Sequence, residues 1–222
     1  MKISASLMCD SFRHLEASLK EMESAGVDLV HVDVMDGTFV PNFTLGPNII
    51  EAVKGMTSIP VDVHLMSVTP EKHLDTFISR LSPGTDYFSI HQEACWPLTR
   101  SVLRIKESGV KAGVALNPAT SVSTLEHILP LLDFVLLMTV EPGFSGQKLV
   151  PYAIDKIASM KKLVAKVHPG VEIEVDGNVS FEHAPKMVKN GANILVGGSS
   201  SVFKKGLSIR EGCAQLRKAC KQ

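Results

Sequence analysis

The pattern of the chain predicts a single α/β domain over residues 1–222, a (β/α)8 TIM barrel with eight parallel strands. Three observations lead to this fold class: eight short runs of β-branched and apolar residues, amphipathic stretches between them, and no Pro- or Ser-rich linker. The length of 222 residues lies at the short end for such barrels. An open doubly wound sheet is the alternative, and the absence of GxGxxG after the first strand disfavours a dinucleotide-binding version of it.

Each expected strand is rich in Val, Ile, Leu or Phe. The expected strands are residues 2–8, 29–36, 60–66, 87–91, 111–118, 134–140, 172–179 and 194–200. The segments between them place apolar residues three or four positions apart, as in residues 12–26 and 152–167, which is the spacing of an amphipathic helix. Gly26, Gly109 and Gly191 follow three such segments and are typical of helix C-termini.

Charge and cysteine content limit the partners and the compartment. Lys plus Arg and Asp plus Glu both number 23, and no run of like charge occurs, so we expect neither nucleic acid nor a membrane surface as a partner. No segment approaches the roughly 18 apolar residues of a membrane span. The four cysteines are scattered without metal-ligand spacing, which suits reduced thiols in the cytoplasm.

Polar residues interrupt three of the expected strands. Side chains alternate between the two faces of a strand, so the residues on one face of each strand point into the barrel. The side chains that this rule turns inward are His31, Asp33 and Met35 in the second strand, Asp62, His64 and Met66 in the third, and Glu172, Glu174 and Asp176 in the seventh. Inward residues near the strand C-termini reach the end of the barrel where enzymes of this fold build active sites.

Four of these side chains form a candidate metal site. His31, Asp33, His64 and Asp176 supply two imidazoles and two carboxylates, a set that suits one divalent transition metal: zinc, iron, manganese or cobalt. A cation would also offset the cost of burying two carboxylates. For any one of them alone, a hydrogen-bonded polar group inside the barrel is an equally good interpretation.

Glycine-rich turns follow the last three strands. Residues 141–147 read EPGFSGQ, residues 176–178 read DGN, and residues 197–203 read GGSSSVF. Such turns let backbone N–H groups approach an anion, and the loops after strands seven and eight often bind phosphate in barrels. Any one of these turns alone is better explained as a tight connection, but three neighbouring ones favour a phosphate site.

Six segments form a recognisable pattern in order and spacing: SASLM (4–8), HVDVMDGTFVPN (31–42), DVHLM (62–66), MTVEPGFSGQ (138–147), EVDGNV (174–179) and VGGSS (196–200). Together they resemble the ribulose-phosphate 3-epimerase family over nearly the whole chain. The resemblance implies a (β/α)8 barrel that inverts C3 of a small-molecule ketose phosphate, expected to be D-ribulose 5-phosphate going to D-xylulose 5-phosphate. It also implies two-base proton transfer through a metal-stabilised enediolate.

The resemblance also implies roles for individual residues. Asp33 and Asp176 would be the paired acid and base, and His31, Asp33, His64 and Asp176 would be the metal ligands. The substrate contacts it implies are Ser6, His64, Met35, Met66, Met138, Gly143, Phe144, Ser145, Gly146, Gly177, Asn178, Gly198 and Ser199. The three methionines fit soft core filler equally well.

Two departures from the family pattern leave the sugar open. Ala5 stands where these enzymes usually have Pro, and Asn178 stands where they typically have a second Gly. Residues 6–9, SLMC, resemble the allulose-6-phosphate 3-epimerase branch, which is the alternative function. Asn178 would be suited to hydrogen-bond a longer or differently posed substrate.

More distant alternatives are another phosphate-binding barrel enzyme, such as an aldol-type synthase or a decarboxylase, and a non-catalytic sugar-phosphate binder. Enzymes of those two reaction classes usually need a Lys inside the barrel, whereas Lys2 and Lys111 begin their strands at the opposite end. Both Asp residues are present, which disfavours a non-catalytic binder. Trp96, Phe88 and His91 are expected to be packing or surface residues. A homo-oligomer is left open.

Overall fold

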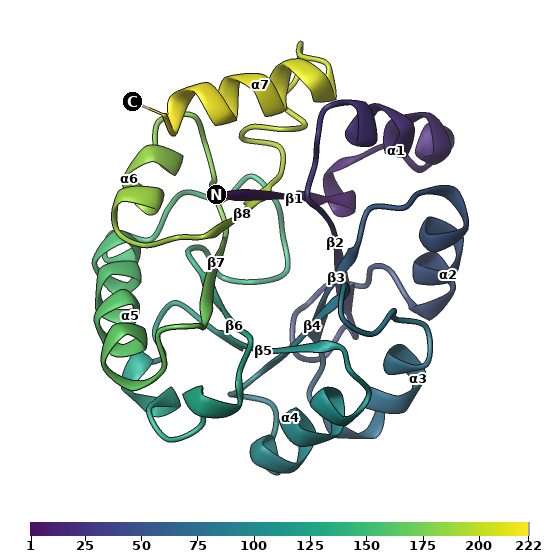
Figure 1. The fold of residues 1–222 in the computed structure, drawn as a ribbon. Helices are drawn as coiled ribbons and strands as arrows, with labels where there is room; N and C mark the ends of the chain where they lie inside the picture. Colours follow the sequence, from purple (N-terminus) through teal and green to yellow (C-terminus); the bar gives the residue numbers. More distant parts are fainter. Residues whose placement is uncertain (222) are drawn as a thin grey trace.

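A computed structural model describes residues 1–221 of the chain and shows a closed barrel of eight parallel strands in sequence order (Figure 1). The strands are β1 (Lys2–Ser6), β2 (Leu29–Met35), β3 (Val61–Met66), β4 (Tyr87–His91), β5 (Lys111–Leu116), β6 (Phe134–Met138), β7 (Glu172–Asp176) and β8 (Ile194–Gly197). The predicted fold class is confirmed. Several strands end earlier than expected, because the chain turns at residues such as Gly177, whose φ of 117° does not continue a strand. Residue 222 lies outside the described residues.

Helices surround the barrel on its outer side (Figure 1). They are α1 (Leu15–Ser24), α2 (Pro47–Met56), α3 (Leu74–Ile78), α4 (Leu98–Glu107), α5 (Ala153–Val167), α6 (Ala184–Lys189) and α7 (Ile209–Ala219). Gly26, Gly109 and Gly191 have φ values of 68°, 81° and 120° just after α1, α4 and α6, as expected of glycines that end helices. No helix among residues 1–221 has both the length and the apolar character needed to cross a membrane.

The expectation of an α-helix after every strand is wrong between β5 and β6. Two 3-10 turns, η4 (Val122–Leu125) and η5 (Leu129–Leu131), occupy this connection. The hydroxyl of Ser121 accepts a hydrogen bond from the N–H of Ser123, which starts η4 as a separate turn. Pro130 lacks the N–H that a continuing helix would need.

The strand alternation rule is confirmed by the two sides of the barrel wall. The valines of β2 and the alternate apolar residues of β3 and β7 belong to the large core between the barrel and the helices. A second apolar cluster fills the barrel itself and includes Tyr87, Phe134 and Leu136. Gly113 on β5 makes room there, because a Cβ at this position would collide with the ring of Phe134.

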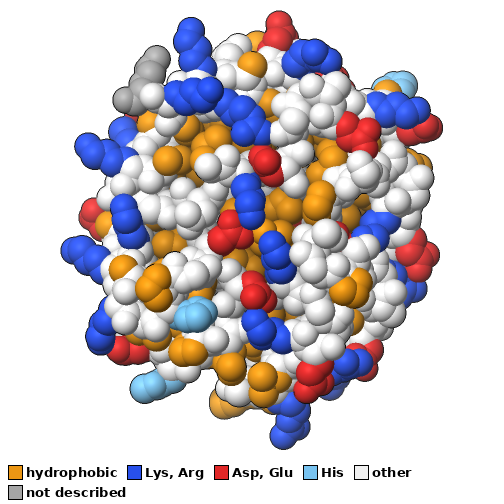
Figure 2. Space-filling view, viewed as in Figure 1, with side chains coloured by type: hydrophobic (Ala, Val, Ile, Leu, Met, Phe, Trp, Pro, Cys, Tyr) orange, Lys and Arg blue, Asp and Glu red, His pale blue; other side chains and the backbone are white. Residues whose placement is uncertain are grey.

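Polar side chains close the barrel at the N-terminal ends of its strands. Nζ of Lys2 lies 2.7 Å from Oε1 of Glu172 and donates to the hydroxyl of Tyr87 at 2.8 Å. Lys111 donates to the same hydroxyl at 2.9 Å, and that hydroxyl donates to Glu172. Lys2 and Lys111 therefore lie at the end of the barrel opposite the C-terminal mouth, as the sequence predicted. Acidic and basic side chains are interspersed across the face shown in Figure 2.

Candidate active site

A cavity opens at the C-terminal ends of the strands. The sequence-predicted residues that line it are Ser6, Asp33, Met35, Met66, Met138, Gly143, Phe144, Ser145, Gly146, Asp176, Gly177, Asn178, Gly198 and Ser199. His31 and His64 are fully buried among the inward-facing strand residues. The structure thus brings the expected site residues to one place, although they come from six of the eight strands or the loops after them.

The four expected metal ligands converge. His31, Asp33, His64 and Asp176 each offer a ligand atom, and these atoms all lie within 4.8 Å of one another. Register explains part of this, because Asp33 on β2 lies directly opposite His64 on β3. Nε2 of His31 and Nδ1 of His64 lie 3.3 and 3.4 Å from the same oxygen, Oδ1 of Asp33. Neither buried nitrogen has a hydrogen-bond partner in the structure. Two unpartnered nitrogens aimed at one carboxylate fit a cation site.

The two carboxyl groups of this cluster have opposite electrostatic surroundings. Burial alone would raise the pKa of Asp33, but the neighbouring His31 and His64 outweigh it and hold that pKa well below the usual range. The pKa of Asp176 is raised to about 7, first by removal from water and then by the nearby charge of Asp33. Asp33 is therefore ionised at a pH at which Asp176 still holds its proton.

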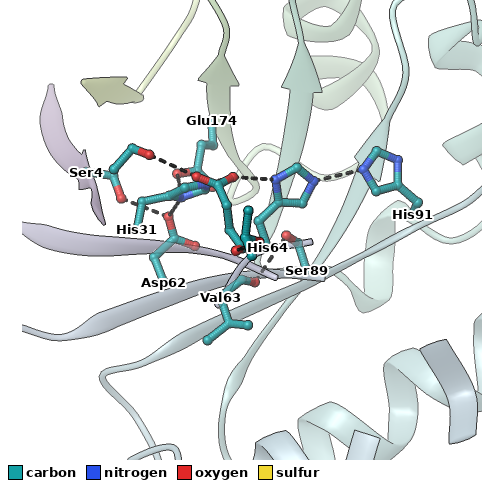
Figure 3. Close-up of polar contacts among 11 residues, drawn as sticks. Ser4, His31, Asp62, Val63, His64, Ser89, His91 and Glu174 are labelled. Atoms are coloured by element: carbon teal, nitrogen blue, oxygen red, sulfur yellow. Dashed lines mark hydrogen bonds and ion pairs between the residues drawn. The ribbon is translucent and has the colours of Figure 1, made fainter. Parts of the chain in front are cut away.

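A second group of polar residues lies deeper in the barrel. Nδ1 of His31 is 2.6 Å from Oδ2 of Asp62, and the hydroxyl of Ser4 donates to the same oxygen at 2.8 Å (Figure 3). Neither carboxyl oxygen of the buried Glu174 has a hydrogen-bond partner, and burial beside Asp62 raises the pKa of Glu174 well above its ordinary value. Strand alternation in the sequence predicted that Asp62 and Glu174 point into the barrel, but it did not predict these contacts.

His91 does more than the sequence suggested. It is fully buried on β4, and its Nε2 lies 2.8 Å from Nε2 of His64 (Figure 3). The alternation that places Tyr87 and Ser89 inside the barrel places His91 there too, and this signal was available in the sequence. Trp96 is fully exposed and Phe88 fully buried, as expected of surface and packing residues.

The loops at the expected phosphate end are packed against one another. Gly177 has a φ of 117°, and a Cβ there would lie 2.8 Å from the backbone nitrogen of Val140. Asn178 has a φ of 45°; its Nδ2 donates to the carbonyl of Gln147 at 2.6 Å, and its Oδ1 lies 3.0 Å from Nδ1 of His183. The side-chain amide thus joins the loop after β6 to the segment after β7.

Solved structures with this fold include proteins of low sequence identity. A 3-hexulose-6-phosphate synthase from Salmonella typhimurium matches with a TM-score of 0.71 at 16% identity, covering 100% of this chain and 99% of that one. A thiamine phosphate pyrophosphorylase from Pyrococcus furiosus matches with a TM-score of 0.65 at 13% identity, covering 99% and 95%. Likeness at these identities concerns the barrel alone.

Sequence relatives are much closer. A ribulose-phosphate 3-epimerase of Bacillus subtilis (strain 168) is 46% identical over 201 residues, 90% of this chain and 91% of the relative. A ribulose-phosphate 3-epimerase of Methanocaldococcus jannaschii is 42% identical over 219 residues, which are 99% of this chain and 91% of the relative. A chloroplastic ribulose-5-phosphate-3-epimerase of Arabidopsis thaliana is 44% identical over 200 residues, which are 89% of this chain and 70% of the relative. The model of the ribulose-phosphate 3-epimerase family matches residues 2–203. Since this match spans all eight strands and the identities exceed 40% over most of the chain, the chain belongs to the ribulose-phosphate 3-epimerase family.

Proposed function

We propose that the protein is a metal-dependent isomerase that inverts C3 of D-ribulose 5-phosphate to give D-xylulose 5-phosphate. The observation that carries this function is the pair Asp33 and Asp176, which border one cavity with opposite pKa shifts. Epimerisation next to a ketone needs one group to remove a proton and another to return one to the opposite face. The names of the close relatives support the same reaction.

Asp33 is suited to be the base in one direction, and Asp176 the acid. The hydroxyl of Ser6 donates to Oδ2 of Asp33 at 2.8 Å, which holds the orientation of that carboxylate in the cavity wall. Asp176 enters from β7, a strand separated from β2 by β8 and β1. The two carboxyls therefore approach the sugar from different sides, and their roles exchange in the reverse reaction.

The ligand set proposed for the metal is His31, Asp33, His64 and Asp176. A bound divalent cation would stabilise the negative charge that develops on the substrate oxygens when the C3 proton leaves. Two nitrogen and two oxygen donors suit zinc, iron, manganese or cobalt. Met35, Met66 and Met138 line the cavity with apolar side chains, which would limit water around the flat intermediate.

The phosphate end of the substrate is proposed to lie against the glycine-rich turns. Gly143, Phe144, Ser145 and Gly146 form one wall of the cavity. Gly177 and Asn178 contribute a second segment, and Gly198 and Ser199 a third. Backbone N–H groups of such turns bind anions without help from a Lys or Arg.

We also propose that the chain acts as one catalytic domain in the cytoplasm. All four cysteines are free in the structure, which agrees with a reducing compartment.

A parallel coupled assay tests the proposal. Purified protein loaded with each candidate metal is given ribulose 5-phosphate or allulose 6-phosphate at matched concentrations. We expect a clearly larger kcat/KM for ribulose 5-phosphate, abolished by exhaustive chelation and restored by one metal ion per chain. A preference for the six-carbon substrate would support the allulose-6-phosphate branch instead. Turnover of neither sugar phosphate would contradict the epimerase assignment.

A further inference from the structure

Three side chains form a connected path from the candidate metal centre toward the surface. Nε2 of His64 lies 2.8 Å from Nε2 of His91 (Figure 3). Nδ1 of His91 lies 3.2 Å from Oε2 of Glu93. Both histidines are fully buried, whereas the Glu93 side chain is 23% exposed. The proposed reaction uses neither His91 nor Glu93, so their arrangement needs another explanation.

Only one order of donors and acceptors satisfies both hydrogen bonds of this path. Two imidazole nitrogens share a hydrogen bond only if one carries the proton and the other offers a lone pair. The ionised carboxylate of Glu93 has no proton to give, so Nδ1 of His91 must be the donor there. A neutral His91 ring carries only this one proton. Nε2 of His91 is then an acceptor, and Nε2 of His64 must carry the proton between the two rings.

This direction decides what His64 offers to the metal centre. A neutral ring protonated at Nε2 has its lone pair on Nδ1, the nitrogen that lies 3.4 Å from Oδ1 of Asp33. A metal ion needs that lone pair. We propose that Glu93 is a positioning residue that sets the tautomer of His91 and, through it, the metal-binding tautomer of His64. This inference rests on the metal site of the proposed function. In the metal-free protein the ionised Asp33 competes for a proton on Nδ1 of His64, but at 3.4 Å it makes no hydrogen bond to that nitrogen, so we expect Glu93 to decide the tautomer there too.

The orientation of Glu93 is itself fixed by the loop after β5. Its Oε1 accepts a hydrogen bond from the N–H of Asn117 at 2.8 Å and another from the hydroxyl of Thr120. The substitution Glu93→Gln keeps the shape but leaves only one oxygen. Since Asn117 and Thr120 both donate, that oxygen stays on their side, and the amide NH2 turns toward His91. A donor then faces Nδ1 of His91, which reverses every hydrogen bond along the path.

The test reads the tautomers directly in metal-free protein labelled with ¹⁵N-histidine, using long-range ¹H–¹⁵N NMR. His64→Gln and His91→Gln variants assign the signals. We expect the wild type to carry Nδ1–H at His91 and Nε2–H at His64, and Glu93→Gln to invert both. Competition with a chromophoric chelator should show metal binding about 10- to 100-fold weaker in Glu93→Gln, the usual effect of losing a group that orients a ligand.

Two control variants separate polarity from packing. Glu93→Asp keeps a carboxylate and should retain the wild-type tautomers. Thr120→Val removes one hydrogen bond to Glu93 but leaves Oε2 facing His91, so both tautomers and metal affinity should stay as in the wild type. A wild type with Nε2–H at His91, or a Glu93→Gln protein with unchanged tautomers and unchanged metal affinity, would overturn the proposal. A wild type that binds no metal would contradict the proposed function instead, while the tautomers would still decide the role of Glu93.

Discussion

Nδ1 of His31 lies 2.6 Å from Oδ2 of Asp62, on the side of the ring that faces away from the candidate metal centre. This contact orients the imidazole and leaves Nε2 free to point toward Asp33, 3.3 Å away. Carboxylate partners of this kind commonly fix the tautomer of a metal-binding histidine. Because Ser4 donates to the same Asp62 oxygen, one carboxylate satisfies two buried donors.

Removing that carboxylate should destabilise the protein even without metal. Asp62→Ala leaves a ring N–H and a hydroxyl buried and unpartnered, and each such group costs about 1–3 kcal/mol. We expect the free energy of unfolding of the metal-free protein to fall by at least about 2 kcal/mol in urea titrations. Glu182→Ala is the control, because the Glu182 side chain is 77% exposed, and it should stay within about 0.5 kcal/mol of the wild type. Equal unfolding midpoints for Asp62→Ala and the control would contradict this account.

Metal affinity should depend on pH in a predictable direction. A proton on Asp176, whose pKa is about 7, competes with the metal for the carboxylate. Below this pKa, protonation of Asp176 should lower the metal affinity by about tenfold for each pH unit. This loss adds to the one caused by a proton on His31, whose pKa Asp33 and Asp62 raise well above its ordinary value despite burial. Chelator competition from about pH 5.5 to pH 8.5 measures how the metal affinity depends on pH. In Asp176→Asn, metal binding should release one proton fewer in this range. A flat profile across this range would argue against Asp176 as a ligand.

Substitution of either proposed catalytic carboxyl, Asp33 or Asp176, should stop proton transfer while preserving the fold. We expect Asp33→Asn and Asp176→Asn each to lower kcat by about 10²- to 10⁴-fold, the usual contribution of general acid–base catalysis. In D2O, the wild type should place deuterium at C3 of the product, because the returned proton comes from a carboxyl that exchanges with solvent. Asp155→Asn, on the exposed face of α5, is the matched control and should turn over normally. Product that keeps the original hydrogen at C3 would rule out the two-base arrangement.

A negative charge at the phosphate end should weaken substrate binding selectively. Ser199→Asp would bring a carboxylate next to the proposed position of the substrate phosphate, and we expect KM to rise about tenfold or more through repulsion at short range. We also expect inorganic phosphate to inhibit the wild type competitively and this variant much more weakly. Ser159→Asp adds the same charge on the exposed face of α5 and should leave KM unchanged. If Ser199→Asp bound substrate and phosphate as the wild type does, the phosphate would have to lie elsewhere.

The sequence predicted the barrel and most of the cavity because both depend on local patterns. Strand alternation alone turned His31, Asp33 and His64 inward, and parallel strands then had to gather them at one end. Contacts between side chains were harder to predict. Which nitrogen of His31 meets Asp62, and whether His91 touches His64, depend on strand register and ring orientation, and no single strand pattern contains that information.

Asn178 illustrates the same limit in a loop. Its place in a glycine-rich turn suggested a hydrogen bond to the substrate. In the structure the side-chain amide donates to the carbonyl of Gln147 and lies beside His183. Gln147 is 31 positions away in the sequence, so only the folded arrangement of the two loops shows that this amide already has protein partners.

The polar closure formed by Lys2, Tyr87, Lys111 and Glu172 has a practical consequence for handling the enzyme. It ties the second residue of the chain to the end of the barrel opposite the cavity, so Met1, which is 42% exposed, emerges on that side. A linker or affinity tag fused to Met1 would extend away from the sugar. Protein immobilised through such a tag would present its open mouth to the solution.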